Sequence, residues 1–303
     1  MPDGGIRSLT TGPVLSDLAV GLLGRCTFPP RGAPLGCAVS GGADSLALLV
    51  LGVAAGCEVT AYHVDHGLRP TSASEAEVVA AAARRLRAGF VPVRVECPPG
   101  PNLEARARKA RFAALPPDVA TGHTVDDQAE TVLANLLRGA GVDGLAGMRP
   151  GPRHPILALR RSETVALVSS LGFDVVTDPS NEDPAFQRNR LRHELLPLAA
   201  DIGRRDVAAV IARQAGLLAD EADYVEQLAS EIEPTDARAL AAAPVVLARR
   251  AVRRWLRSLS GDSYPPDAAA VERVLAVARG SVAACEISGG HRVRRSHGRL
   301  VCG

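Results

Sequence analysis

Short apolar runs alternate with helix-like patterns along the first half of this chain. The apolar runs are LGCAV at 35–39, EVTAYHV at 58–64, FVPVRVE at 90–96 and DVATGH at 118–123. Helical patterns lie between and after them, at 45–55, 74–87, 102–115 and 126–139. Strands that alternate with helices are typical of βαβ units, in which helices cover both faces of a parallel sheet. The sequence therefore predicts an α/β fold with a doubly wound, Rossmann-like parallel sheet.

The pattern changes toward the C-terminus. HPILAL at 154–159 and FDVV at 173–176 predict two further strands, before a loop that enters a helix near 190. Beyond about Leu198 the pattern is helical up to Ser260, and a Gly-punctuated tail at 288–303 predicts a hairpin. A chain of 303 residues has room for two domains. We therefore predict an α/β domain at 1–200 and a smaller, mainly helical domain at 201–303.

The composition indicates the cellular compartment of this chain and the groups that can bind anions. No stretch approaches the roughly 18 uninterrupted apolar residues of a membrane span, and the N-terminus lacks a secretory pattern. The six cysteines are scattered and form no C-x-x-C pair, so we predict buried free thiols, with metal or catalytic roles as the alternative. These features predict a cytoplasmic protein without membrane contact. Because Lys109 is the only lysine, we expect phosphate contacts to be made by arginine side chains or backbone amides.

Three polar clusters follow predicted strands. They are the loop from Ser40 to Ser45, the segment 63–67 (HVDHG) and the segment 122–127 (GHTVDD). Ligands of open α/β sheets bind outside the carboxyl ends of the strands. We therefore expect these clusters, which are far apart in sequence, to converge in space.

The first cluster, Ser40-Gly41-Gly42-Ala43-Asp44-Ser45, lies between an apolar strand and a helix that starts near Asp44. Two glycines let the backbone approach an anion closely, and hydroxyls and free amides at a helix N-terminus donate to phosphate oxygens. The loop is not G-x-x-x-x-G-K-[ST], so the Walker and dinucleotide-binding patterns do not apply. A plain Gly-rich turn with a serine cap is the alternative.

The other two clusters carry histidines and carboxylates. His63, Asp65 and His66 match an H-x-D-H pattern that also binds metals, but a binuclear site needs more ligands nearby; a capped turn is the simpler alternative. Asp126 and Glu130 share a helical face beside Asp127. These acids either complement the helix dipole, hold Mg²⁺ on a nucleotide, orient an ammonium group or act as a base.

Arginines are concentrated in two further segments. Arg106, Arg108 and Arg111 lie on one predicted helix at spacings of two and three, so they cannot all share a face, and Glu104 with Arg108 is an alternative exposed ion pair. The tail carries four more, which are either nucleic-acid contacts or a solvated basic face: Arg292, Arg294, Arg295 and Arg299.

These motifs together resemble the ATP pyrophosphatase (PP-loop) superfamily and, within it, the bacterial tRNA(Ile)-lysidine synthase family. The matching segments are SGGADS at 40–45, HVDHGLR at 63–69, NLEARAR at 102–108 with RF at 111–112, GH at 122–123 with DDQAET at 126–131, LLRG at 136–139, and DPSN at 178–181 with RNR at 188–190. They keep the family's order over roughly residues 35 to 197. Phe112 stands where the family more often has tyrosine, so a hydroxyl contact is absent there.

The resemblance implies an adenine nucleotide alpha hydrolase-like fold and a ligase that forms a C–N bond. Its substrates would be ATP with Mg²⁺, L-lysine and tRNA(Ile) with a CAU anticodon, with catalysis in 1–200 and tRNA contacts in 201–303. The oligomeric state stays open between a monomer and a homodimer.

The resemblance also implies roles for individual residues. It implies that the catalytic residues are Asp44, Asp126, Asp127 and Arg106. It also implies that Asp44 and Asp127 bind the metal. The nucleotide-binding set would be Ser40, Gly41, Gly42, Ala43, Asp44, Ser45, His63 and His123. The substrate-binding set would be Glu130, Arg108, Arg188 and Arg190, with Arg192 and the tail arginines on tRNA backbone.

Rival functions remain. A tRNA thiolation enzyme shares the loop but depends on paired cysteines, which this chain lacks. GMP and argininosuccinate synthetases share the loop without the acidic motif and the Arg188 segment. A nucleotide-binding sensor of the universal-stress type has little use for the acidic cluster. A metal-dependent phosphohydrolase is the last alternative.

Overall fold

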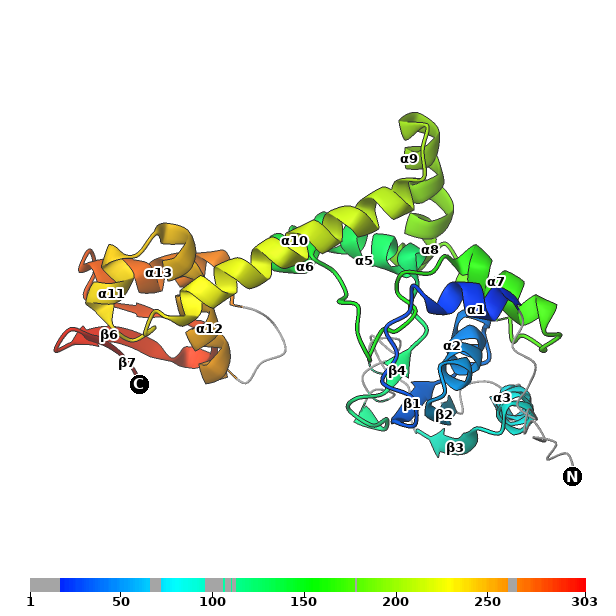
Figure 1. Cartoon of the computed structure of the whole chain (residues 1–303). Coiled ribbons are helices and arrows are strands. Elements are labelled where there is room, and N and C mark those ends of the chain that lie inside the picture. Colours follow the sequence, from blue (N-terminus) through cyan, green and yellow to red (C-terminus); the bar gives the residue numbers. More distant parts are fainter. Residues whose placement is uncertain are drawn as a thin grey trace, which may run out of the picture. The chain divides into compact units, whose positions relative to one another are not determined.

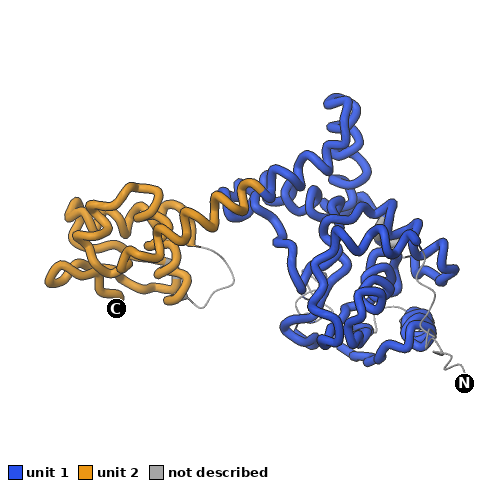
Figure 2. Tube along the Cα trace, in the orientation of Figure 1, with its two compact units in different colours: residues 1–216 blue, residues 217–303 orange. Residues whose placement is uncertain are grey.

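The computed structural model describes residues 17–65, 72–95, 106, 110, 113–177, 179–260 and 266–303. The chain forms two compact units, residues 1–216 and 217–303 (Figure 2). Helix α10 (Val207–Ser230) contains the junction between them. The domain boundary predicted after residue 200 stays a prediction.

A four-stranded parallel sheet organises the first unit. Its strands are β1 (Pro34–Ala38), β2 (Glu58–Asp65), β3 (Gly89–Arg94) and β4 (Ala120–Thr121). Their order is β3-β2-β1-β4, so β1 lies between β2 and β4 (Figure 1). Cys37 of β1 pairs with Ala61 on one side and with Ala120 on the other. The prediction of a parallel α/β sheet from the apolar runs is confirmed.

Helices follow β1, β2 and β4 as predicted, and the helix predicted at 102–115 lies largely outside the described residues. Those before α10 are α1 (Asp17–Leu23), α2 (Ala43–Ala54), α3 (Ser72–Leu86), α5 (Val125–Leu137), α6 (Val142–Leu145), α7 (Arg161–Ser170), α8 (Gln187–Arg190) and α9 (Leu196–Gly203). A 3₁₀ turn (Pro179–Glu182) precedes α8, and a π-helical turn (Leu191–Leu195) joins α8 to α9. Helix α2 is apolar around its whole circumference and is buried from Ser45 to Gly52, which makes it the centre of this core.

Two predicted strands do not form. HPILAL at 154–159 is a series of turns in which Leu159 N donates to Ile156 O, and FDVV at 173–176 is irregular. Ile156 and Leu159 are apolar because they fill the core. Val176 N donates to Gly41 O of the loop after β1 rather than to a sheet neighbour. Apolar runs of this length pack equally well as strands or as buried turns, and periodicity does not separate the two.

The second unit is mainly helical and ends in a small sheet. It contains α11 (Ala237–Ala242), α12 (Val245–Ser260), α13 (Ala268–Arg279), β5 (Ala284–Glu286), a 3₁₀ turn (Ser288–Gly290), β6 (Arg292–Ser296) and β7 (Arg299–Cys302). The strands pair antiparallel in the order β5-β6-β7. The hairpin predicted in the tail is therefore confirmed as β6 and β7. Among the described residues, no helix is long and apolar enough to cross a membrane.

The described cysteines are free thiols. Cys37 and Cys57 are buried, Cys26, Cys285 and Cys302 are half-buried, and Cys97 lies outside the described residues. Burial raises the pKa of Cys37 to about 12, which keeps that thiol protonated at neutral pH. For these positions the prediction of structural thiols agrees with the structure.

Candidate functional site

The loop after β1 is shaped by its two glycines. Gly41 has φ +91°, and a Cβ there would lie 2.6 Å from Val176 Cγ2, so only glycine fits. The hydroxyl of Ser45 donates to Gly42 O at 2.8 Å and accepts from Ser40 N at 3.2 Å, which closes the loop on itself. Gly42 is the N-cap of α2 and has no side chain to satisfy the first amides of that helix. The result is an anion-binding geometry at a helix N-terminus.

Strand β4 brings the acidic segment to this loop. Gly122 directly follows β4, and a Cβ there would lie 2.6 Å from the backbone oxygen of Asp44. This close approach of two backbones places the start of α5 beside the start of α2. The predicted convergence of the Ser40 loop and the 122–127 segment is therefore found.

Asp127 has a structural and an electrostatic role. Its Oδ2 accepts hydrogen bonds from Thr124 N at 2.9 Å and from Thr124 Oγ1 at 2.8 Å, which caps α5. Its Oδ1 accepts from Arg161 at 2.9 Å and from Arg188 at 3.1 Å. One oxygen of Asp127 thus caps the start of α5, and the other oxygen belongs to an ionic cluster.

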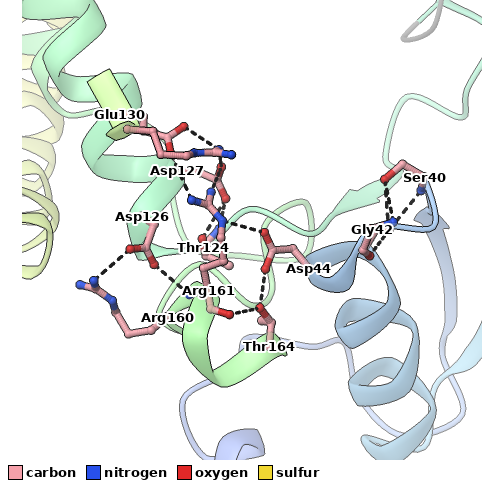
Figure 3. Close-up of polar contacts among 12 residues, drawn as sticks. Ser40, Gly42, Asp44, Thr124, Asp126, Asp127, Glu130, Arg160, Arg161 and Thr164 are labelled. Carbon is pink, nitrogen blue, oxygen red and sulfur yellow. Dashed lines mark hydrogen bonds and ion pairs between the residues drawn. The ribbon is translucent and has the colours of Figure 1, made fainter. Parts of the chain in front are cut away.

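Arg161 links the carboxylates of two helices (Figure 3). Its Nε donates to Asp44 Oδ2 at 3.2 Å, its Nη2 to Asp127 Oδ1 at 2.9 Å and its Nη1 to Glu130 Oε1 at 3.3 Å. Its backbone N donates to Asp126 Oδ2 at 2.8 Å. One residue at the start of α7 therefore contacts all four acids.

Glu130 is the most deeply buried of these acids. Its side chain is 0% exposed and accepts from Arg188 Nε at 2.6 Å, from Arg192 Nε at 2.7 Å and from Arg161. A buried carboxylate is tolerated only when cations and hydrogen bonds replace water. Arg192 reaches Glu130 from the π-helical turn. Such turns are rare in proteins overall, and those that occur are frequently at functional sites.

The two candidate metal-binding acids have pKa values shifted in opposite directions. Burial raises the pKa of Asp44 above its ordinary value, and the hydrogen bonds from Thr164 and Arg161 offset this only in part. Burial also acts to raise the pKa of Asp127, but Arg161, Arg188 and the Thr124 amide outweigh it and lower that pKa. Carboxylates whose environments separate their pKa values are typical of sites that need distinct acid and base roles.

The histidines are placed differently from the acids. His63 is buried, and its Nδ1 lies 2.9 Å from Val39 O, so this nitrogen carries the proton and donates. Its Nε2 is buried and has no hydrogen-bond partner in the structure as described. His123 Nδ1 lies 2.7 Å from Thr121 Oγ1, which also contacts His154 Nδ1 at 2.9 Å.

Mg²⁺ on a nucleotide is commonly held by one or two protein carboxylates together with the phosphates of the nucleotide. Asp44 and Asp127 supply hard oxygen ligands, and the charge of Asp127 is close enough to help raise the pKa of Asp44. This donor set fits Mg²⁺ shared with a nucleotide. In the described ranges no group of three histidine, cysteine, aspartate or glutamate side chains could hold a metal by itself. His66, one of the residues in the alternative metal motif, lies outside those ranges.

Of the arginines predicted for substrate binding, Arg188 joins this cluster through Asp127 and Glu130. Arg190 forms an exposed ion pair with Glu194 at 2.8 Å and does not contact the acids. Arg106 is half-buried, and Arg108 lies outside the described residues. The roles predicted for these arginines stay predictions.

Arg160, Arg161 and Thr164 were not predicted as site residues from the sequence. Arg160 contacts Asp126 Oδ1 at 2.9 Å and Asp206 at 2.7 Å, and Thr164 donates to Asp44. One signal was available: two consecutive arginines start a helix, where positive charge opposes the dipole unless carboxylates lie close by.

Comparisons with known proteins identify two domains in this chain. Residues 27–199 match the family model described as a PP-loop domain, and residues 236–301 match the TilS substrate binding domain. The chain is thus a PP-loop protein, and such a domain uses ATP.

Curated relatives define the family more closely. The chain is 42% identical to a tRNA(Ile)-lysidine synthase of Nocardia farcinica, over 78% of this chain and 80% of that protein. It is 36% identical to the synthase of Thermobifida fusca over 90% and 92% of the two chains. This chain belongs to the tRNA(Ile)-lysidine synthase family.

A solved structure shares the fold at low sequence identity. The U34-tRNA thiolase of Methanococcus maripaludis aligns with a TM-score of 0.54 and 16% identity, covering 67% of this chain and 78% of that one. This likeness supports the Rossmann-like fold alone.

Proposed function

We propose that this chain is a ligase that joins L-lysine to C2 of the wobble cytidine of tRNA(Ile) with a CAU anticodon, at the expense of ATP. The product, lysidine, changes codon reading from AUG to AUA. The observation that carries the proposal is the contact of Arg161 with Asp44 and with the Asp127–Glu130 pair, because it joins a phosphate-binding loop to an amine-binding acidic cluster.

The reaction has two steps in this proposal. O2 of the cytidine attacks the α-phosphorus of ATP, which releases pyrophosphate and leaves an adenylated cytidine. The ε-amine of lysine then attacks C2, and AMP leaves with the oxygen. Adenylation is needed because a carbonyl oxygen is a poor leaving group.

The loop residues have defined tasks in the first step. The amides of Gly41, Gly42 and Ala43 and the hydroxyls of Ser40 and Ser45 bind the pyrophosphate at the start of α2. Asp44 and Asp127 would hold Mg²⁺, which neutralises phosphate charge when bound. His63 and His123 are proposed to lie beside the nucleotide.

The acidic cluster serves the second step. Ionised carboxylates orient the lysine ammonium and take the proton that the amine loses before attack. Asp127 suits this task because its lowered pKa keeps it ionised at neutral pH. Glu130 is fully surrounded by arginines, so an incoming ammonium exchanges with one of them. Arg188, whose side chain is 39% exposed against 26% for Arg161 and 25% for Arg192, is the most accessible candidate for that exchange.

The proposal also covers the remaining predicted roles. Arg106, Arg108 and Arg190 are proposed to contact nucleotide or RNA phosphate. A cytoplasmic location is part of the proposal because ATP, lysine and tRNA are all available there.

The direct test is incorporation of labelled lysine into a tRNA(Ile) transcript with a CAU anticodon, in the presence of ATP and Mg²⁺. Wild-type protein should transfer lysine, Asp44→Ala should not, and Asp118→Ala, which removes an exposed acid before β4, should behave as wild type. Absence of transfer by folded wild-type protein with a competent tRNA would overturn the substrate assignment.

A second measurement separates an enzyme from a nucleotide-binding sensor. Asp126→Ala should retain ATP binding, because Asp126 contacts only Arg160 and the Arg161 amide among the contacts described for it, and should reduce lysine transfer. A sensor would show ATP binding without pyrophosphate release in both proteins.

A further inference from the structure

Each of the two acids proposed to hold the metal has one oxygen fixed by a neutral hydrogen-bond donor. Asp44 Oδ1 accepts from the hydroxyl of Thr164. Asp127 Oδ2 accepts from the backbone N and the hydroxyl of Thr124, at 2.9 and 2.8 Å. Both threonines are fully buried. They therefore orient the two carboxylates and direct the second oxygen of each, Asp44 Oδ2 and Asp127 Oδ1, toward other partners.

These two second oxygens share one partner, Arg161. Its Nε donates to Asp44 Oδ2 at 3.2 Å, and its Nη2 donates to Asp127 Oδ1 at 2.9 Å (Figure 3). Arg188 Nη2 also donates to Asp127 Oδ1, at 3.1 Å, and Arg192 Nη2 lies 3.7 Å from the same oxygen. Among the ion pairs of the described residues, only those of Arg161 reach both acids. One guanidinium therefore bridges the pair.

A divalent cation and this guanidinium need the same two oxygens. Mg²⁺ binds carboxylate oxygens at about 2.0 to 2.1 Å. A metal ion bound to both Asp44 Oδ2 and Asp127 Oδ1 would lie in contact with the guanidinium, and the two positive charges would repel each other strongly at such short range. Binding of Arg161 and binding of a metal at this pair of oxygens are therefore mutually exclusive.

The remaining partner of Arg161 stays neutralised when the guanidinium moves. Arg161 Nη1 donates to Glu130 Oε1 at 3.3 Å, whereas Arg188 Nε and Arg192 Nε donate to the same carboxylate at the shorter distances of 2.6 and 2.7 Å. A buried carboxylate is costly only when its counter-charges are removed. Glu130 keeps two of its three arginines, so it does not hold Arg161 in place.

A nucleotide offers the guanidinium a different partner. Asp44 lies in the first turn of α2, two residues after the N-cap Gly42, so phosphates bound at this helix start lie beside the acid. Guanidinium groups bind phosphate oxygens in a bidentate manner, as they bind carboxylates. The phosphates also supply further oxygen ligands for Mg²⁺. A bound nucleotide thus favours both the release of Arg161 from the acids and the capture of the metal by them.

We propose that Arg161 makes binding of the divalent metal depend on the nucleotide. Without nucleotide, the guanidinium holds Asp44 Oδ2 and Asp127 Oδ1 and excludes free metal ions. With nucleotide, the guanidinium moves onto a phosphate oxygen, and the metal binds the two oxygens that it leaves. The inference rests on the proposed function for the assignment of the metal to these two acids.

The test measures metal binding and nucleotide binding separately in the full chain. Mn²⁺ is the probe, because it binds the same oxygen ligands as Mg²⁺ and the free ion is measured by electron paramagnetic resonance. Without nucleotide, Arg161→Met should bind Mn²⁺ about tenfold more tightly than wild type, because a charged competitor is lost. With EDTA and no metal, the same variant should bind an ATP analogue with a methylene group between its α and β phosphates about tenfold more weakly. Damage to the fold alone would weaken both.

Three further variants locate the effect. Arg160→Met removes a neighbouring arginine that binds Asp126 and Asp206, and it should leave both affinities at their wild-type values. Arg161→Gln removes the charge but keeps a hydrogen-bonding amide, and it should show the same opposite changes if Arg161→Met does not fold. Asp44→Asn in the Arg161→Met background should abolish the gain in Mn²⁺ affinity.

The outcomes that overturn the inference differ from those that refute the proposed function. Mn²⁺ affinity no higher than in wild type in either Arg161 variant, or a gain that Arg160→Met shares, would overturn the inference. A gain that survives Asp44→Asn would do the same, because the metal would then lie elsewhere. Lysine transfer by wild type leaves the proposed function intact in each case. Wild-type protein that transfers no lysine refutes the proposed function and not the exchange, which the two binding measurements report by themselves.

Discussion

Arg161 Nε lies 3.2 Å from Asp44 Oδ2, and this contact joins the first turn of α7 to the first turn of α2. The two residues are 117 positions apart in the chain. The same guanidinium binds Asp127 and Glu130 of α5, so the relative positions of three helix starts depend on one side chain.

Removal of this guanidinium should damage both the fold and the activity. Arg161→Met leaves three carboxylates without a shared counter-charge, and we expect a loss of about 2 kcal/mol in the free energy of unfolding. Lysine transfer should fall at least about 100-fold, because misplacement of catalytic groups is costly. Arg160→Met is the control, since Arg160 binds Asp126 and the exposed Asp206, pairs worth at most about 1 kcal/mol. A wild-type transfer rate in Arg161→Met would contradict the role assigned to Arg161.

Asp44 and Asp127 should affect stability with opposite signs. The raised pKa of Asp44 means that its ionised form costs stability, a cost that develops as pH rises through the folded-state pKa. Asp44→Asn should therefore raise the unfolding temperature at neutral pH and lose this advantage in acid. The lowered pKa of Asp127 contributes stability that is present above the unfolded-state pKa and is lost as pH falls through the folded-state pKa. Asp127→Asn should lower the unfolding temperature at neutral pH, with the difference vanishing in acid.

Thermal unfolding without nucleotide measures both effects. The pH should range from pH 3, roughly one unit below the ordinary aspartate pKa, to neutral pH 7. Each 1 kcal/mol corresponds to a shift of about 2 to 4 °C in a protein of this size class. Shifts of the same sign in the two variants would contradict the separation of their pKa values. Both variants should lose lysine transfer.

Gly122 should be intolerant of a methyl group. In Gly122→Ala the new Cβ meets backbone atoms of Asp44 and Ser45, which cannot rotate away, and we expect a loss of about 1 to 3 kcal/mol together with weaker ATP binding. Gly216→Ala is the matched control on α10, where a Cβ meets nothing within 4 Å and should stabilise the helix by about 0.5 to 1 kcal/mol. Chemical denaturation and ATP titration of both variants check this pair of opposite effects.

Much of the fold was predictable because local signals and tertiary structure agree. The runs at 35–39, 58–64, 90–96 and 118–123 each contain described residues of one strand, since each run is bounded by turn residues and followed by a helical pattern. HPILAL failed as a strand because Ile156 and Leu159 are apolar for burial rather than for pairing. The acids of the site were predictable from their motif, whereas the contacts of Arg161 were not, because its partners are distant in sequence.

Thiol chemistry provides an independent check on the core. Cys37 and Cys57 should resist a maleimide reagent in the native protein at pH 7.5, about one unit below the pKa of a free thiol, because both are buried and burial raises the pKa of each. Both should react after denaturation. Rapid labelling of Cys37 in folded protein would contradict its position in the central strand.

The ionic cluster around Glu130 contains four carboxylates and four guanidinium groups, and Arg160 also binds Asp206, so the formal charges nearly cancel (Asp44, Asp126, Asp127, Glu130, Arg160, Arg161, Arg188 and Arg192). Beyond a Debye length of about 10 Å such a cluster exerts little field on a free amino acid. In the proposed function, lysine is then selected by local exchange of partners and not by long-range steering, so its KM should change little with ionic strength.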